Sequence, residues 1–276
     1  MKTIKLYKRD LILGLFRRLF LYLLPVLIAF LQVRSCYDMV DPMFQDGVIS
    51  SMGTVADYFL YCTRGMAVYQ FNPEDMFAVP IFWFMFQIGI SYIIAYYAMD
   101  DYQNNGRNLF LAIRNRKSWW TAKCLWCLTS VVVYFVIYAG SLMVWSIAYG
   151  AKWDHFHITD FIETMFGNNI GYFSTRDMIF CAVVVPCFIT MGICLMQIIG
   201  GFFTTPVFSF AIVCGVYIFS AYYTKWWLPG SYTMWLRSSY YTVQGIRPIS
   251  GIVFGLLLIF LAWYSGRTYF KIKDVM

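Results

Sequence analysis

The sequence offers one stretch whose side chains could bind a metal ion. In WDHFH, His155 and His157 stand beside Asp154, and Asp160 and Glu163 follow shortly after. Imidazole and carboxylate groups are common ligands of zinc. A solvated loop would carry the same residues, however, and we favour that interpretation and expect no bound metal.

Motifs for nucleotide binding and for hydrolysis are absent from the sequence. It contains no G-x-x-x-x-G-K-[ST] phosphate loop, no H-E-x-x-H and no G-x-S-x-G. CLWC, residues 124 to 127, has metal-ligand spacing, but it opens an apolar run without a second pair, and packing in the core explains it better. We therefore expect a chain that is not itself an enzyme, with no catalytic residue, no bound cofactor and no nucleic-acid partner.

Composition places the chain in a membrane. Hydrophobic residues make up 61% of its 276 residues and charged residues only 13%, whereas soluble domains carry about 25% charged residues. A bilayer core of about 30 Å takes about 20 helical residues to cross, so the chain has room for about six spans. The expected fold class is an all-α membrane protein with six transmembrane helices in one domain, residues 1–276.

Runs without charged residues mark the spans, because an ionised side chain is costly at the centre of a bilayer. Two glycines and a proline in GGFFTTP, residues 200 to 206, divide the longest run into two helices. The predicted spans are about 19–33, 81–99, 121–150, 178–199, 206–224 and 248–266. The predicted loops are 34–77, 100–118, 151–177 and 225–247.

The distribution of charge orients these spans. The N-terminal segment, the 100–118 loop with Lys123 and the C-terminal tail hold 14 of the 21 basic residues, whereas ten of the 14 acidic residues lie on the opposite face. Basic loops stay on the cytoplasmic side. We therefore expect both termini and the 100–118 loop in the cytoplasm and the other three loops outside, where Cys36 and Cys62 could be free or oxidised.

The first 18 residues predict an amphipathic helix in the cytoplasmic interface. On a helical wheel Ile4, Tyr7, Leu11 and Leu15 share one side. The other side carries the basic residues Lys2, Lys5, Lys8 and Arg9. Such a helix would lie on the leaflet before the first span. The alternative is an ordinary basic flank with no helix in the membrane plane.

The spans themselves are almost free of charge. No acidic or basic side chain lies in the interior of spans two to six, and Lys123 stands at the entrance of the third. Ion-coupled transporters and intramembrane hydrolases usually need such groups at membrane depth. Gln87 and Gln197, the most polar residues of their spans, are expected to form hydrogen bonds between helices. The bundle must therefore be passive or be driven by a partner.

The segment NNGRNLFLAIRNRKSWWTAK, residues 104 to 123, offers a place for such a partner. Leu109, Phe110 and Ile113 fall on one side at helical spacing, while basic residues occupy the rest. This pattern predicts a short amphipathic helix that docks a cytoplasmic protein. Alternatively, the apolar face rests on lipid and the basic residues only orient the loop. The candidate docking residues are Asn105, Gly106, Arg107, Leu109, Phe110, Ile113, Arg114, Arg116 and Lys117.

This segment and the six-span layout resemble the membrane permease subunits of ABC-2-type ATP-binding-cassette exporters, especially small Firmicutes permeases of peptide or bacteriocin export and immunity. In that family the second span is followed by an acidic start, an Asn/Gly pair, an amphipathic helix, a basic turn and a lysine that enters the third span. The corresponding residues here are Asp100 and Asp101, Asn105 and Gly106, Leu109 to Ile113, Arg114 to Lys117, and Lys123. The Glu-Gly-Thr wording usual at this helix is absent, and the 34–77 loop has no matching motif.

The resemblance implies a function. The segment around 101–117 would be a coupling helix seated in a groove of a separate ATPase subunit, which would bind the ATP and magnesium. Two permease chains, identical or different, and two ATPase subunits would form the working unit in a bacterial cell membrane. Spans one, two and five would line the path of an amphipathic substrate, either a peptide or bacteriocin or a lipid-like molecule. The aromatic segment 226–245 would dip into the outer interface, where an ordinary aromatic belt is the alternative.

Two other functions remain open. A non-transporting membrane scaffold or sensor could use the same basic helix to bind a cytoplasmic protein. A polytopic lipid-modifying enzyme could instead place its active site in the outer loops, and it would then depend on Asp154, His155, His157 or nearby carboxylates.

Overall fold

The structure, a computed structural model, describes residues 2–70, 77–104, 116–153, 159–167, 174–242 and 245–272. Within these ranges the chain is helical and forms no strand. Five helices are long and apolar enough to cross a membrane: Phe16–Gln45, Ile81–Asn104, Arg116–Ala148, Arg176–Phe203 and Pro248–Lys271. Helices suit this environment because their backbone hydrogen bonds are all internal. The chain is therefore an all-helical, membrane-embedded protein.

The main helices of the bundle are α2 (Leu23–Gln45), α4 (Ile81–Ala95), α6 (Arg116–Ala148), α9 (Val185–Phe203), α10 (Pro206–Tyr222) and α11 (Pro248–Ile272). The shorter elements are α1 (Lys2–Gly14), η1 (Phe16–Tyr22), α3 (Val55–Thr63), α7 (Asp160–Phe166), α8 (Thr175–Ile179), η3 (Phe180–Val184), η4 (Pro229–Thr233) and η5 (Trp235–Arg237). After a turn at Tyr96, the helix that begins with α4 resumes and continues to Asn104. The apolar helix α10 is shorter than the five long ones.

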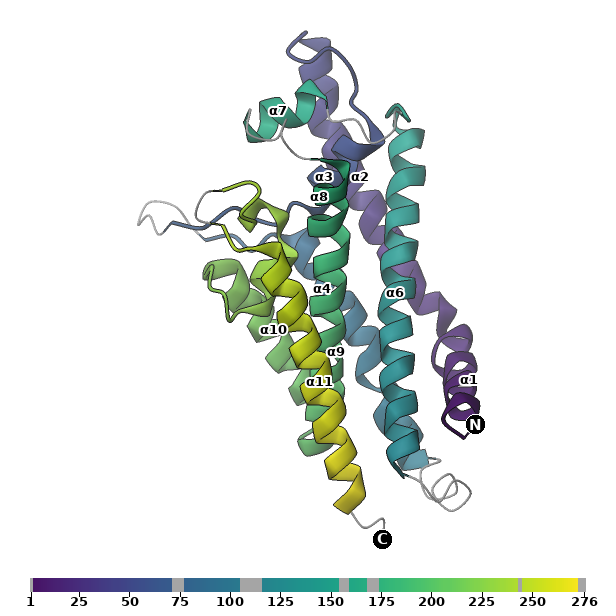
Figure 1. Cartoon of the computed structure of the whole chain (residues 1–276). Coiled ribbons are helices and arrows are strands. Elements are labelled where there is room, and N and C mark those ends of the chain that lie inside the picture. The colour runs from purple at the N-terminus through teal and green to yellow at the C-terminus, as the bar shows by residue number, and fades with distance from the viewer. Residues whose placement is uncertain are drawn as a thin grey trace.

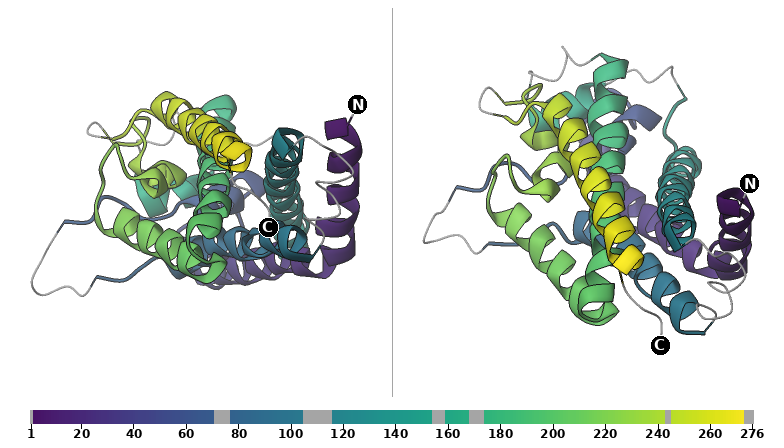
Figure 2. Two further views of the ribbon diagram at one scale, coloured as in Figure 1. Left: turned by 90° about the horizontal axis from the view of Figure 1, so that it is seen from below. Right: turned by 60° about the horizontal axis from the view of Figure 1, so that its bottom comes forward.

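Helix α9 forms the centre of the bundle. It packs against α4, α6, α10 and α11, and α6 in turn packs against α1 and α2. Figure 1 shows α1, the start of α6 and the C-terminal end of α11 at one end of the bundle, with α3 and α7 at the other. Seen from below in Figure 2, α6 stands between α1 and α11. We refer to the end that holds α1 and the end of α11 as the basic end.

Small residues bring α9 and α11 close together. A Cβ atom on Gly255 would lie 2.8 Å from the carbonyl oxygen of Phe188, and one on Gly192 would lie 2.7 Å from the Cβ of Leu258. Both distances are shorter than packed atoms tolerate. Glycine at these positions therefore allows the two backbones to approach, which is how helices commonly associate in a membrane.

Helix α1 packs against the bundle with part of the predicted apolar side, since Tyr7, Leu11 and Leu15 contact the core, and with a neighbouring stripe that was not predicted. Its buried residues are Leu6, Asp10 and Gly14, which are spaced four residues apart and face α6. Ile4, predicted on the apolar side, is 59% exposed. The prediction ranked side chains by polarity alone, whereas the buried side of α1 includes a carboxylate that finds basic partners within the bundle.

The predicted outer loop 34–77 contains more helix than expected. Helix α2 continues to Gln45, and Arg34 and Asp38, which suggested the end of the span, form an exposed ion pair of 2.9 Å one turn apart. Such pairs support a helix outside the hydrocarbon region. Helix α3 then begins with a capping box formed by Thr54 and Asp57 and packs against α2 and α6.

Candidate functional site

The structure describes both stems of the predicted docking segment. Residues 105–115, and with them seven of the nine candidate docking residues, lie outside the described ranges. Arg116 and Lys117 belong to the first turn of α6 and are partly buried. The stem before the segment ends at Asn104 and carries Asp101, which is 5% exposed.

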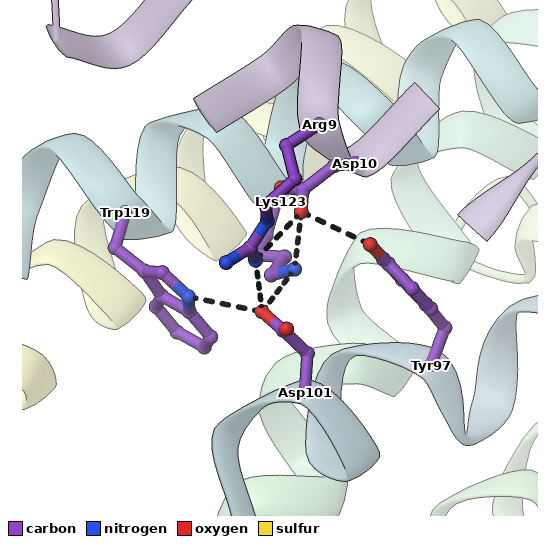
Figure 3. Close-up of polar contacts among 6 residues, drawn as sticks. All are labelled: Arg9, Asp10, Tyr97, Asp101, Trp119 and Lys123. Atoms are coloured by element: carbon purple, nitrogen blue, oxygen red, sulfur yellow. Dashed lines mark hydrogen bonds and ion pairs between the residues drawn. The ribbon is translucent and has the colours of Figure 1, made fainter. Parts of the chain in front are cut away.

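A buried cluster of charged groups joins these two stems to α1 (Figure 3). Lys123 of α6 places its Nζ atom 2.7 Å from Asp101 Oδ2 and 2.8 Å from Asp10 Oδ1. The Nη2 atom of Arg9 lies 2.6 Å from the same Asp101 oxygen and 3.0 Å from the same Asp10 oxygen. We call Arg9, Asp10, Asp101 and Lys123 the ion-pair cluster. Its two cations each contact both of its carboxylates.

Aromatic residues surround the cluster. The Tyr97 hydroxyl donates a hydrogen bond of 3.0 Å to Asp10 Oδ1, and the Trp119 indole donates one of 3.4 Å to Asp101 Oδ2 (Figure 3). The Lys123 ammonium lies 4.4 Å from the centre of the Tyr97 ring, where a cation–π interaction is favourable. These rings exclude water from one side of the cluster and strengthen its electrostatic interactions.

The charges of the cluster balance, and this balance allows it to be buried. Lys123 and Asp10 are fully buried, and an unpaired charge there would cost several kcal/mol. Burial disfavours the charged guanidinium of Arg9, but the carboxylates of Asp101 and Asp10 outweigh that effect and raise its pKa above the ordinary value. Arg9 therefore remains a cation, and two positive charges face two negative ones.

The geometry fastens three separate elements to one another. Asp101 precedes the 105–115 segment by one turn of helix, Lys123 follows it, and Asp10 belongs to α1. Gly14, one turn after Asp10, lets α1 lie against Trp126, because a Cβ there would be 2.6 Å from the indole nitrogen. Moving either stem relative to α1 would therefore break buried ion pairs.

Sequence reasoning missed this cluster although it named some of its members. Lys123 was used only to orient the spans and as part of the family resemblance, Asp101 only as part of that resemblance, and Asp10 had no assigned role. One usable signal existed: Leu6, Asp10 and Gly14 recur every four residues and so share a helix side. A carboxylate on that side of an otherwise basic helix indicates a basic partner inside the protein.

A second polar region lies inside the bundle. The Gln87 side-chain oxygen accepts hydrogen bonds from Thr190 of α9 (2.9 Å) and Tyr217 of α10 (3.2 Å). Gln32 of α2 donates to the carbonyl oxygen of Cys62 (3.0 Å) and accepts from the Tyr138 hydroxyl. As expected for span glutamines, these side chains connect helices, and so does Gln197, which the sequence also singled out and which donates to the carbonyl oxygen of Ser91.

Gln32 and Gln87 border a narrow cavity of about 20 Å³ between α2, α3, α4, α6 and α9, enough for a water-sized group. A wider groove of about 270 Å³ adjoins it and shares Gln32, Cys62 and Trp83 with its wall. Arg64 is the charged residue of this groove, and its guanidinium lies 3.9 Å from the centre of the Tyr61 ring. The groove and cavity together form an amphipathic recess.

The aromatic segment between α10 and α11 is folded into the protein. Its two short turns, η4 and η5, are buried, and η4 packs against α9, α10 and α11. Arg237 is fully buried there and donates to four backbone carbonyls: those of Met66, Ala67, Ser220 and Ala221. Two of these carbonyls belong to the last turn of α10, the negative end of the helix. Arg237 therefore fastens the C-terminal end of α10 to the segment after α3.

The histidines, acidic residues and cysteines that could bind a metal form no metal site within the described residues. His155, His157 and Asp154 lie outside them, and no group of three or more metal-ligating side chains occurs among the residues that the structure does describe. Cys36 and Cys62 are free and buried, as are Cys124 and Cys127. Comparison with known proteins adds nothing to this description, because no family model, no curated protein and no solved structure matches the chain.

Proposed function

We propose that the chain is the membrane-spanning permease subunit of an ATP-driven ABC exporter. In this proposal α10 counts as a sixth crossing, and both termini and the 100–118 loop face the cytoplasm. The loop binds a separate ATPase subunit, and a second permease chain completes the transporter. The chain itself binds no nucleotide, since it carries no phosphate-binding motif.

The ion-pair cluster is the observation that carries this proposal. A transporter driven by a partner must convert movement of a docking segment into movement of its helices. Asp101 and Lys123 stand on the two sides of the 105–115 segment and meet at the same pair of opposite charges on α1. Such a connection is stiff, because separating buried ion pairs costs about 3–5 kcal/mol. Movement of a bound ATPase would therefore reach α1 and α6 together.

The interior of the bundle supports an amphipathic substrate. The recess formed by the groove and the narrow cavity combines aromatic walls with Gln32, Gln87 and one arginine, Arg64. Among the described residues no carboxylate lines it. A small cation would find no anionic ligand among these residues, whereas a peptide or lipid-like molecule could use both kinds of surface. The recess is lined by α2 and α4, which correspond to spans one and two of the predicted path.

The proposal is tested by isolating the partner. Tagged wild-type protein, extracted in a mild detergent, should retain a protein with a Walker-type ATP-binding motif. The double variant Arg107→Glu/Phe110→Glu should lose it, because it inverts a charge and adds another on the docking face. The matched control is Ile4→Glu/Lys8→Glu, which makes the same kinds of change on exposed positions of α1 at the same end of the bundle and should keep the partner.

Activity separates this proposal from a scaffold. The ATPase activity of the isolated complex should fall on Lys123→Met while the partner stays bound, since the docking segment is intact but its stem is not. A bound partner whose nucleotide hydrolysis is unaffected by this chain would favour the scaffold or sensor. Recovery of no nucleotide-binding protein in several detergents would overturn the exporter, and the outer loops with His155 and His157 would then be examined for enzymatic activity.

A further inference from the structure

A basic groove lies between α6 and α11 at the basic end of the bundle. Its walls are formed by six residues, and it encloses about 310 Å³. The lining residues are Lys117, Trp263, Tyr264, Arg267, Thr268 and Lys271. Three of the six carry a positive charge, two are aromatic, and none of these described lining residues is a carboxylate.

The sequence builds this groove from one stripe of α11 and the first turn of α6. Trp263, Arg267 and Lys271 are spaced four residues apart and so share a side of the helix. The two helices are held close because Gly266 leaves room for the Trp120 ring, where a Cβ would lie 2.1 Å from an indole carbon. The Trp120 indole also donates a hydrogen bond of 3.0 Å to the Trp263 carbonyl oxygen. The groove is therefore fixed by packing.

No described acidic residue neutralises the positive charges of the groove. Within the described part of the chain, Lys117, Arg267 and Lys271 form no ion pair. Arg267 instead lies 5.0 Å from the centre of the Trp263 ring, which orients the guanidinium beside the groove. Arg267 and Lys271 are like charges one helical turn apart, an arrangement that is unfavourable unless an anion lies between them.

A broad apolar surface continues from the groove along the outward side of α11. Phe260 is 58% exposed and Leu257 49%, and further exposed apolar residues follow toward the middle of the helix. Tyr264, at the boundary between this surface and the basic residues, is 56% exposed. Tryptophan and tyrosine are typical of the level at which lipid headgroups meet hydrocarbon. A molecule bound in the groove can therefore extend an apolar part along α11.

We propose that the basic groove binds the phosphate headgroup of an anionic phospholipid, whose acyl chains lie along the outward side of α11. Lys117, Arg267 and Lys271 neutralise the phosphate, and Trp263 and Tyr264 border the glycerol region. Basic pockets between transmembrane helices bind anionic headgroups by this chemistry. A free phosphate would use the charges but not the apolar surface, and so it fits the groove less well. This inference stands without the exporter, because it concerns a lipid site on the surface of the bundle.

The test counts lipids retained by the protein. Purified wild-type protein in detergent is titrated with phosphatidylglycerol or phosphatidylcholine, and bound lipid is measured by native mass spectrometry. We expect retention of phosphatidylglycerol over phosphatidylcholine. The triple variant Lys117→Gln/Arg267→Gln/Lys271→Gln should bind phosphatidylglycerol on the order of a hundredfold more weakly. Each basic residue is expected to contribute roughly a fivefold factor to the affinity, and the three factors multiply.

The matched control places the same change at the opposite end of the bundle. Lys152→Gln/Arg176→Gln/Arg247→Gln removes three exposed basic residues and should leave phosphatidylglycerol binding unchanged. An equal loss in the control would show a general charge effect and overturn the site. Equal binding of both lipids by the wild type would overturn it as well, and this comparison does not depend on any variant folding. Complete competition by millimolar inorganic phosphate would indicate a site for the free anion and not for lipid.

Discussion

Lys123 is the fully buried cation of the ion-pair cluster, and its removal leaves two carboxylates close together. We expect Lys123→Met, which keeps the length of the side chain, to lower the free energy of unfolding by about 3 kcal/mol, since one partner of a buried pair is lost and Arg9 alone remains. Thermal unfolding in detergent measures this effect. The control Lys8→Met, at an exposed position of α1, should change stability by less than about 0.5 kcal/mol.

A second substitution tests whether Lys123 stabilises the protein through its direct contact with Asp10. Adding Asp10→Asn to Lys123→Met removes one of the two opposing carboxylates, so the double variant should be more stable than Lys123→Met alone. A double variant whose loss equals the sum of the two single losses would contradict the direct contact, because contacting residues are not additive.

Arg237 provides a second prediction at this scale. Its guanidinium reaches four carbonyls on two segments, and burial lowers its pKa to about 10, so it remains charged at neutral pH. Arg237→Lys should still lower the free energy of unfolding by about 2 kcal/mol. The single ammonium group of lysine cannot donate hydrogen bonds to all of the carbonyls that the planar guanidinium reaches. Arg247→Lys, at an exposed position, is the matched control. Equal thermal stability of the two variants would contradict this role for Arg237.

Some of these residues could be predicted from sequence and others could not. Gln87 was expected to bond between helices because a glutamine in an apolar span must find a partner. Lys123 was expected only at the entrance of a span and Asp10 was given no role, because both stand near the ends of their segments, where basic and acidic residues are ordinary. Their burial depends on the angle at which α1 meets α6, and that angle is fixed by tertiary contacts such as Gly14 on Trp126.

At the scale of elements, the approach of α9 to α11 is set by glycine. We expect Gly255→Ala to lower stability by about 1–3 kcal/mol, because the new methyl group would lie against the Phe188 carbonyl oxygen and push the helices apart. Gly140→Ala is the matched control, since a Cβ there meets nothing within 4 Å. It should leave stability unchanged or raise it by up to about 1 kcal/mol, as alanine favours a helix. Similar unfolding temperatures for both variants would exclude a close α9–α11 contact.

The elements themselves divide into those that hydropathy reveals and those that it does not. Long apolar runs indicated the helices that contain α4, α6, α9 and α11, because a charge-free run of that length has few other structures. The buried helix α3 was missed, since Asp57 marks a solvated loop by composition. In the structure that carboxylate caps its own helix and accepts hydrogen bonds from Thr159, with the Thr159 hydroxyl at 2.6 Å. Hydropathy cannot distinguish a buried polar residue that forms hydrogen bonds within the protein from one that is exposed to solvent.

For the whole molecule, the two proposals place different demands on the basic end of the bundle. The docking segment must move when a partner moves, and the ion-pair cluster connects it to α1 and α6. The basic groove, on the α11 side of α6, would attach the bundle to the surrounding lipid. Because α6 contacts both α1 and α11, force applied at the segment acts against a helix held by lipid on its other side. Anionic lipid should therefore affect the activity of the complex as well as its stability.

The side of the membrane that the basic end faces decides whether a cytoplasmic partner can reach the docking segment. Helix α1 and the C-terminal end of α11 lie at this one end (Figure 1), and the proposal places it on the cytoplasmic side. Single cysteines at Lys8, Arg247 and Lys271 can be labelled with a membrane-impermeant maleimide, with the wild type as the baseline for its own cysteines. We expect Arg247→Cys to react in intact cells, and Lys8→Cys and Lys271→Cys only after the membrane is opened. Reaction of Lys271→Cys but not Lys8→Cys in intact cells would contradict the shared end of α1 and α11, and with it the helix arrangement that forms the basic groove.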